Sequence, residues 1–448
     1  MVTARAAALH ALVALHRGRC DRLRAALDQS ALAGREQALA FELAHGVVRR
    51  ERLLDFVLDG LAHRGLPKDP LLRTALRLGA YQLLFVHGMP ARAAVHETVE
   101  LVRSNKGFAN AMLRRLTERV FLRAADPAAV TTELALSPSR TLEMPKPLPS
   151  DEAERLAIVH SLPDFLMRRW QQRFGRDELR QIAEAASEVP GVFLRVAADR
   201  ERDALRAELA AADVACEPVP HPRLLLWTGG SSPFGTAAFR SGQFAIQDPT
   251  ALLAAEAVPC GPGSTVLDLC AAPGTKTCLL AERVRPDGMV FAFDPDPQRR
   301  ARIGENAVRL GLEQTVRIVH AVGDLPQADA VLADVPCSNS GVLGRRVEVR
   351  RRLTASTFAE LAGLQRELLA RAIALARPGG AVVYSTCSID REENEDVVAA
   401  VLAAPGTPAC TTERMHLTLP LAGAHDGGFL AVLRRRAQQK CQQECQQE

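Results

Sequence analysis

Aromatic residues and long apolar runs are scarce in this sequence. Phe, Trp and Tyr together make up 4% of the 448 residues, so the core must be mostly aliphatic. No window reaches the roughly 18 uninterrupted apolar residues of a membrane-spanning helix. The apolar N-terminal stretch is broken by His10, His16 and Arg17, which favours an amphipathic helix over a secretion signal. We expect a cytoplasmic protein with no membrane segment.

Cysteine pairs with metal-site spacing are also missing. The ten Cys are scattered without a CxxC pair, which argues against a zinc site and predicts that the protein holds no metal. Without a secretion signal, the expected state of these side chains is the reduced thiol. Cys441 and Cys445 fall in the low-complexity stretch CQQECQQE, and we predict a disordered tail over 437–448.

Positive charge is concentrated near the N-terminus. Residues 1–130 hold 20 Lys and Arg against 12 Asp and Glu, a local +8, whereas the whole chain carries +4. A basic region on a near-neutral body suggests an acidic partner such as nucleic acid, and a merely solvated Arg-rich surface is the alternative.

The periodicity divides the chain into several domains. Leu53, Leu54, Val57, Leu58 and Leu61 follow helical spacing, and 1–124 is predicted to be an all-helical bundle. The polar, Pro-rich stretch 125–150 predicts a linker. Helical and strand patterns alternate over 151–240, which indicates a small α+β unit.

Short aliphatic strands alternate with helices from 241 to 436. The strands are expected at STVLDLC, GMVFAFD, TVRIVH, DAVLAD and GAVVYST. This pattern predicts a doubly wound, Rossmann-like parallel sheet with helices on both faces. The predicted fold class is therefore multidomain, α and α/β.

The first of these strands runs into a turn of small residues, Ala271–Gly274, followed by a helix. The turn lacks both the GxGxxG pattern of dinucleotide folds and the P-loop pattern. An acidic residue, Asp294, ends the second strand, where a carboxylate can accept hydrogen bonds from ribose hydroxyls. The pattern favours a nucleoside-cofactor site, and an ordinary βα turn with a capping acid is the alternative.

Two cysteines follow the fourth and fifth strands. Cys337 lies in Asp334–Ser338 (DVPCS) and Cys387 in Tyr384–Ser388 (YSTCS). A single Cys is most often a small buried hydrophobe. Because ligands of open α/β sheets bind beyond the carboxyl ends of the strands, both thiols are expected to face the crevice of the cofactor turn.

These segments resemble the RNA cytosine-5 methyltransferases. The resemblance rests on Asp268–Thr277 (DLCAAPGTKT), the two cysteine segments, Gln247-Asp248 and Glu392-Glu393-Asn394. The N-terminal segments LGAYQLL, HETV and KGFANAMLRR are similar to the NusB-type RNA-binding domain. A NusB-like domain joined to this catalytic domain is the arrangement of the bacterial RsmB (Sun/Fmu) family.

The resemblance implies methylation of C5 of a 16S ribosomal RNA cytosine with S-adenosylmethionine. By this resemblance Cys387 is the nucleophile, Cys337 assists release of the product and Asp334 holds the N3/N4 edge of the cytosine. The implied cofactor residues are Cys270, Ala271, Ala272, Pro273, Gly274, Thr275, Lys276, Asp294, His320 and Asp334. The family's third strand ends in Gly-Asp, so either His320 or Asp324 takes that place here.

Some alternatives stay open at this point. The same enzyme could act on transfer RNA, or the chain could be a non-catalytic RNA-binding or assembly factor. Retention of both cysteines with Asp334 and Lys276 argues against the second, and a second Cys in a Thr-Cys-Ser motif argues against a DNA methyltransferase. The five Arg of 344–352 could hold RNA phosphates or be a solvated charge run. We expect a monomer.

Overall fold

The computed structural model describes residues 3–437 and divides the chain into two compact units. Among the described residues, unit 1 consists of 3–188 and 343–352, and unit 2 of 189–342 and 353–437. The predicted tail lies, apart from residue 437, outside the described residues. Within the described part, no helix is long and apolar enough to cross a membrane.

Unit 1 begins with the predicted helical bundle. Its core is aliphatic: Leu53, Leu54, Val57, Leu58 and Leu61 are all buried, as their helical spacing predicts. The Asp69 side chain caps one helix by accepting from Leu71 N, and Pro70 occupies its first turn. The helices are α1 (Ala4–His16), α2 (Leu23–Asp28), α3 (Gly34–Arg49), α4 (Glu51–Leu61), α5 (Pro70–Phe85), α6 (Ala91–Glu100) and α7 (Lys106–Thr117).

The segment 125–150 contains two strands where its composition predicts a linker. Strands β2 (Glu133–Ser137) and β3 (Arg140–Glu143) form a hairpin, and β1 (Val120–Phe121) pairs with β3. Pro138 lies in the hairpin turn, and neither strand contains a proline, so the prolines of this segment do not interrupt the pairing of the strands. Helices α8 (Glu152–Val159), α9 (Asp164–Arg173) and α10 (Arg176–Ser187) complete this part of unit 1.

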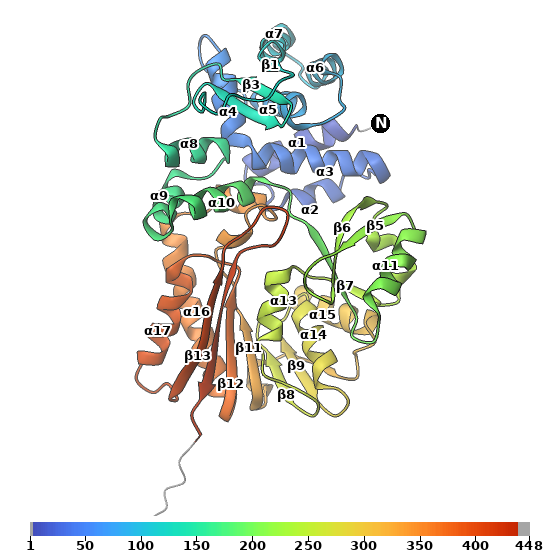
Figure 1. Cartoon of the computed structure of the whole chain (residues 1–448), viewed down its shortest axis with the longest axis vertical. Helices are drawn as coiled ribbons and strands as arrows, with labels where there is room; N and C mark the ends of the chain where they lie inside the picture. Colours follow the sequence, from blue (N-terminus) through green and yellow to red (C-terminus); the bar gives the residue numbers. More distant parts are fainter. Residues whose placement is uncertain (1–2, 438–448) are drawn as a thin grey trace, which may run out of the picture. The chain divides into compact units, whose positions relative to one another are not determined.

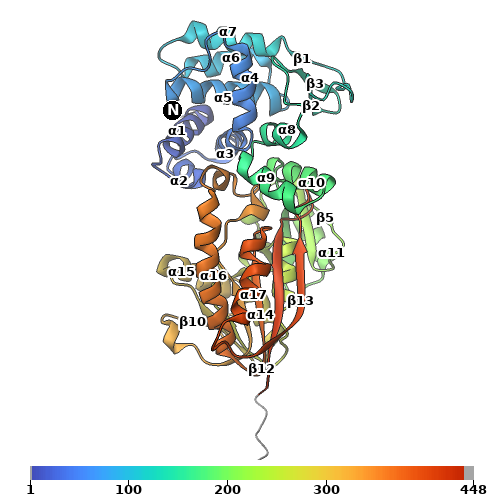
Figure 2. The ribbon, with the colours of Figure 1, turned by 90° about the vertical axis from the view of Figure 1, so that its left-hand side faces the viewer.

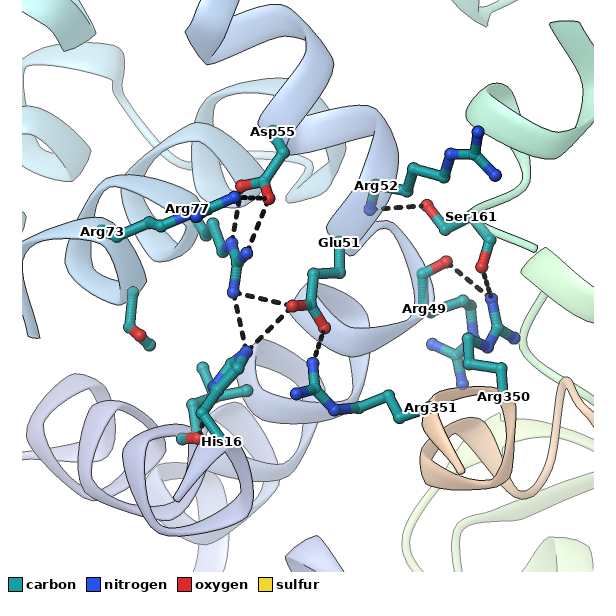
Figure 3. Close-up of polar contacts among 12 residues, drawn as sticks. His16, Arg49, Glu51, Arg52, Asp55, Arg73, Arg77, Ser161, Arg350 and Arg351 are labelled. Carbon is teal, nitrogen blue, oxygen red and sulfur yellow. Dashed lines mark hydrogen bonds and ion pairs between the residues drawn. The ribbon is translucent and has the colours of Figure 1, made fainter. Parts of the chain in front are cut away.

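A second stretch of chain, Leu343–Arg352, also belongs to unit 1. Figure 3 shows Arg350 of this stretch beside Arg49 and Ser161. The Arg350 guanidinium is buried and donates to the carbonyls of Arg49 at 3.0 Å and His160 at 3.1 Å. It also donates to the carbonyls of Ser161, Ala186 and Leu343.

Arg350 thereby caps three helix ends at once. Arg49 ends α3, His160 is the C-cap of α8, and Ala186 lies in the last turn of α10. Unpaired carbonyls at helix C-termini attract a cation. Arg351 forms an ion pair with Glu51, which also pairs with Arg77 and His16 (Figure 3). The hypothesis that the whole Arg cluster holds RNA phosphates is therefore wrong for Arg350.

Unit 2 opens with a small antiparallel sheet in the order β5-β6-β4-β7. Leu194, Val196, Leu205 and Phe244 belong to its core. The elements are β4 (Val192–Val196), α11 (Arg202–Ala211), β5 (Val214–Pro218), β6 (Leu224–Gly230), η1 (Pro233–Gly235), α12 (Ala237–Arg240) and β7 (Phe244–Ile246).

A seven-stranded sheet in the order β10-β9-β8-β11-β12-β14-β13 forms the rest of unit 2. Its strands are β8 (Thr265–Asp268), β9 (Met289–Phe293), β10 (Val316–Val319), β11 (Ala328–Asp334), β12 (Ala376–Thr386), β13 (Cys410–Thr418) and β14 (Gly428–Arg435). The first five in this order are parallel, as predicted, whereas β14 runs antiparallel to β12 and β13 antiparallel to β14. The Rossmann-like fold class is confirmed, with a C-terminal hairpin added at one edge.

Helices cover both faces of this sheet. Alternate residues of β11 point to opposite sides: Val331 packs with α16 and α17, and Leu332 with α14 and α15. Figures 1 and 2 show α16 and α17 together on one side of the sheet. The helices are α13 (Pro249–Glu256), α14 (Thr275–Val284), α15 (Pro297–Arg309), α16 (Ala355–Leu375) and α17 (Glu395–Ala403).

Candidate active site

The strand order places the predicted site residues together. β8 and β11 are neighbours in the sheet although β9 and β10 separate them in sequence, and β12 lies beside β11. The connections after β8, β11 and β12 therefore emerge at one edge, where an open α/β sheet binds its ligands. These connections carry Ala271–Gly274, Cys337 and Cys387.

The turn after β8 is shaped by close packing. Gly274 has φ 98°, and a Cβ atom there would lie 3.1 Å from Ile303 Cα, so the position favours glycine. Asn306 Nδ2 donates to the Pro273 carbonyl at 2.9 Å, and Ala271 N donates to the Phe293 carbonyl. The turn is thus held against β9 and α15 while it leads into the N-terminus of α14.

Asp294, which follows β9, is fully buried and bound to this turn. Its Oδ2 accepts from Ala272 N at 3.3 Å and lies 3.3 Å from Arg299 Nη2, and its Oδ1 accepts from Asp296 N. Each carboxylate oxygen has about two acceptor sites, and these three contacts leave one of them, on Oδ1, for a ligand hydroxyl. The residue predicted to bind ribose therefore also orders the turn.

Lys276, in the first turn of α14, and Asp334, at the end of β11, form an ion pair. Lys276 Nζ lies 2.6 Å from Asp334 Oδ2, and Ser385 Oγ donates to Asp334 Oδ1. Burial alone would lower the pKa of Lys276, but the Asp334 carboxylate raises it above its ordinary value, so the side chain stays an ammonium. Asp334 keeps about a third of its side chain exposed, with 32% accessible.

The two predicted cysteines meet at the ends of β11 and β12. Their Sγ atoms are 3.0 Å apart, with Cys337 buried and Cys387 partly exposed. The hydrogen bond with Cys387 and burial raise the pKa of the Cys337 thiol well above its ordinary value. A thiol that holds its proton is a poor nucleophile, which favours Cys387 for that role.

Asn339 contacts both cysteines and was missed by the sequence reasoning. Its Nδ2 donates to the Cys337 carbonyl at 2.7 Å, and its Oδ1 accepts from Cys387 Sγ at 3.3 Å. The residue has φ 62°, a left-handed conformation that Asn adopts more readily than most residues. A polar residue directly after Cys-Ser was the available signal.

Asp268, at the end of β8, was quoted in the motif but given no role. It is 1% exposed, Thr277 Oγ1 donates to its Oδ2 at 2.7 Å, and its Oδ1 has no partner. Burial raises the pKa of this carboxyl to about 7. An unpaired buried carboxylate oxygen beside the turn suits a ligand that carries a positive charge or a hydrogen-bond donor.

The raised pKa of Asp268 predicts a pH-dependent stability. The folded state keeps the proton up to about pH 7, so this stabilising contribution is complete below pH 4 and is lost as the pH rises through 7. Between pH 5 and 8 the loss is about 3 kcal/mol. Asp268→Asn cannot titrate, so its free energy of unfolding should not fall in this way. Its stability relative to the wild type should therefore rise by that amount between pH 5 and 8. Hydrogen exchange of β8 amides without cofactor measures it, and parallel pH profiles would contradict the assignment.

His320 and Asp324 both lie beyond the carboxyl end of β10. His320 directly follows the strand and Asp324 ends η2 (Val322–Asp324), and both are exposed. Among the described residues neither forms a hydrogen bond or ion pair with the turn after β8, and the choice between them stays a prediction.

Asp248 supports the turns that carry the two cysteines through the backbone at 426–427. Asp248 caps α13 by accepting from Thr250 N, and it accepts from Asp426 N at 3.2 Å. The adjacent Gly427 donates to the Gly341 carbonyl, and Gly341 N donates to the Cys387 carbonyl at 3.0 Å. A Cβ atom on Gly341 would lie 2.7 Å from Gly427, so backbone-to-backbone contact fixes the two cysteine turns.

Comparison with known proteins agrees with this arrangement. Residues 257–421 match the model of the 16S rRNA methyltransferase RsmB/F family, 2–118 the NusB family, and 162–225 the ferredoxin-like domain of RsmF/B-like methyltransferases. A probable ribosomal RNA small subunit methyltransferase B of Synechocystis is 31% identical, covering 92% of this chain and 94% of its own length. One from Bacillus subtilis is 30% identical, covering 88% and 87%.

A solved structure shares the fold of a large part of the chain. The methyltransferase homolog protein from Pyrococcus horikoshii has a TM-score of 0.54 and 27% identity, over 64% of this chain and 100% of its own. Together with the full-length relatives, these matches confirm the resemblance drawn from the motifs. The chain belongs to the RsmB/F family of 16S rRNA methyltransferases.

Proposed function

We propose that the chain transfers a methyl group from S-adenosylmethionine to C5 of one cytosine in 16S ribosomal RNA through a covalent adduct. The observation that carries this proposal is the pair of thiols 3.0 Å apart at adjacent strand ends, beside the Lys276–Asp334 ion pair. The names of the relatives support ribosomal RNA of the small subunit as the substrate.

The residues around the turn after β8 fit S-adenosylmethionine. The unpaired Oδ1 of Asp268 suits its ammonium group, Asp294 can accept from ribose hydroxyls, and the tight Gly274 lets a ligand approach the backbone. When bound, S-adenosylmethionine supplies a methyl group on a positively charged sulfur. The carboxylates of Asp268 and Asp294 would hold it near the cysteines.

Loss of Asp294 is expected to weaken cofactor binding. Asp294→Ala removes acceptors for the ribose and the bond to Ala272 N, so the affinity should fall about 10- to 100-fold. Asp296→Asn is the matched control, because it removes an exposed carboxylate two residues away while Asn still caps α15. Titration calorimetry with S-adenosylmethionine and no RNA measures both, and equal affinity in wild type and Asp294→Ala would refute the assignment.

Cys387 opens the reaction in this proposal. Its thiolate adds to C6 of cytosine, which makes C5 nucleophilic enough to attack the methyl group. The Lys276 ammonium interacts electrostatically with Cys387. Before the attack, the Cys387 thiol donates a hydrogen bond to Asn339 Oδ1, which holds the side chain in place.

Asp334 orients the base. With Lys276 and Ser385 fixing its oxygens, the carboxylate can accept from the N4 amino group and from a protonated N3 of the cytosine. The target base must leave its stack to reach Cys387, which costs less in a loop or bulge than in a duplex.

Cys337 acts after methyl transfer. The C5 proton must leave and the C6–Sγ bond to Cys387 must break, which restores the aromatic ring and the free thiol. C5 and C6 are adjacent ring atoms, so the group that takes the C5 proton has to lie close to the nucleophile, and the distance between the two Sγ atoms meets this requirement. Because Cys337 holds its proton in the resting site, it gives that proton to the departing Sγ of Cys387 and takes up the C5 proton in its place.

Product identification tests the proposed function. The protein is incubated with unmodified 16S ribosomal RNA, transfer RNA and tritiated methyl donor, and the RNA is digested to nucleosides. We expect labelled 5-methylcytidine from 16S RNA alone. Label in transfer RNA would favour that substrate, a different nucleoside would refute the C5 chemistry, and no label with RNA still bound would favour the non-catalytic factor.

A further inference from the structure

The mechanism leaves unassigned a buried carboxylate beneath the two cysteines. Glu393 ends η5 (Arg391–Glu393), six residues after Cys387, and is 0% exposed. Its Oε1 accepts from Ser338 N at 2.8 Å and from Gln365 Nε2 at 2.9 Å, and its Oε2 accepts from Ser338 Oγ at 2.5 Å.

These contacts reach both cysteine turns. Ser338 follows Cys337, and its Oγ lies 3.3 Å from the Oγ of Ser388, which follows Cys387. Ser340 Oγ joins the same network at 3.1 Å from Ser388 Oγ. Hydroxyl groups can donate or accept, whereas an ionised carboxylate only accepts, so Glu393 sets the direction of these bonds.

Gln365 of α16 extends the network to the residue before Cys337. Its Nε2 donates to the Pro336 carbonyl at 2.9 Å as well as to Glu393. Tyr384 OH donates to the Glu393 backbone carbonyl at 2.5 Å. The Glu393 carboxylate thus contacts Ser338 directly and Pro336 through Gln365, while the Glu393 backbone carbonyl contacts the strand that leads to Cys387.

Stability alone does not explain a carboxylate at this place. Burial raises the pKa of Glu393, although bonds from Ser338, Ser388 and Gln365 offset part of this shift. A buried charge is commonly no more stabilising than apolar residues of similar volume. What the carboxylate adds is a fixed geometry between two loops that are separated in sequence.

We propose that Glu393 is a positioning residue that holds Cys337 Sγ and Cys387 Sγ at the spacing required to act on adjacent atoms of one cytosine ring. This inference rests on the proposed function for its catalytic meaning. The placement itself concerns only the two thiols.

The spacing is measured without RNA by dibromobimane, which becomes fluorescent when it bridges two thiols. The part of the fluorescence that is lost in Cys337→Ala is the part that comes from this pair of thiols. Glu393→Ala and Ser338→Ala should slow bridging about tenfold, because a displacement near 1 Å is enough to spoil such geometry. Glu393→Gln keeps the shape and one acceptor oxygen and should bridge at close to the wild-type rate. Glu367→Gln, an exposed site on α16, is the matched control.

Kinetics provide the second measurement. For Glu393→Ala, kcat should fall by about 100-fold while KM for RNA and for S-adenosylmethionine changes little, with recovery in Glu393→Gln. Unchanged bridging in both Glu393→Ala and Ser338→Ala, or equal slowing in Glu367→Gln, would overturn the inference. If Glu393→Ala does not fold, Ser338→Ala decides. A different outcome is that the variants bridge slowly but the wild-type protein methylates no RNA. That result would refute the proposed function and leave the placement of the two thiols by Glu393 intact.

Discussion

Replacing Cys387 with alanine is expected to abolish turnover and to leave no covalent protein–RNA complex. Without its thiolate nothing adds to C6, so C5 does not become nucleophilic and the methyl group stays on the cofactor. The matched control is Cys410→Ala, a partly exposed cysteine in β13, which should methylate like the wild type. Denaturing gels and transfer of tritiated methyl groups measure both outcomes.

Cys337→Ala should give the opposite gel pattern. Attack by Cys387 and methyl transfer still occur, but elimination stalls, so each protein molecule transfers no more than about one methyl group and stays bound to RNA. The slower band should require S-adenosylmethionine. A trapped band in Cys387→Ala and not in Cys337→Ala would reverse the roles, and full activity in both variants would make the cysteines core residues.

Arg350→Met is expected to destabilise unit 1 by about 3–5 kcal/mol, because the carbonyls at the C-termini of three helices, and that of Leu343, lose their donor. Arg352→Met removes an exposed arginine from the same stretch and should change the free energy of unfolding by less than about 0.5 kcal/mol. In a Trp227→Phe background, Trp170 is the remaining Trp, and its fluorescence during urea unfolding reports on unit 1. Equal midpoints for the two variants would show that Arg350 is not a structural cap.

The central part of the site could be predicted because open α/β sheets bind their ligands beyond the carboxyl ends of the strands. Cys337 and Cys387 are 50 residues apart in sequence, yet each follows an aliphatic strand, and parallel neighbours bring such ends together. The same reasoning located the turn before Lys276. It did not predict that Lys276 pairs with Asp334, since that contact depends on the order of β8 and β11.

Other features depend on contacts that no local pattern encodes. Arg350 lies in a run of arginines typical of a solvated or phosphate-binding surface, and only the convergence of three helix C-termini makes it a buried cap. Glu393 and Asn339 gain their importance from the two turns that meet at them. Strand β13 is largely exposed at the sheet edge and lacks the apolar run by which the central strands were found.

Bisulfite sequencing of 16S ribosomal RNA tests the central claim most directly, because methylation at C5 protects cytosine from conversion. RNA is compared between cells with the gene, cells without it, and cells complemented with wild type or with Cys387→Ala. The account predicts that one cytosine loses protection when the gene is removed, regains it with the wild type, and does not regain it with Cys387→Ala. Protection that is unchanged at every cytosine after removal of the gene, or restored by Cys387→Ala, would contradict it.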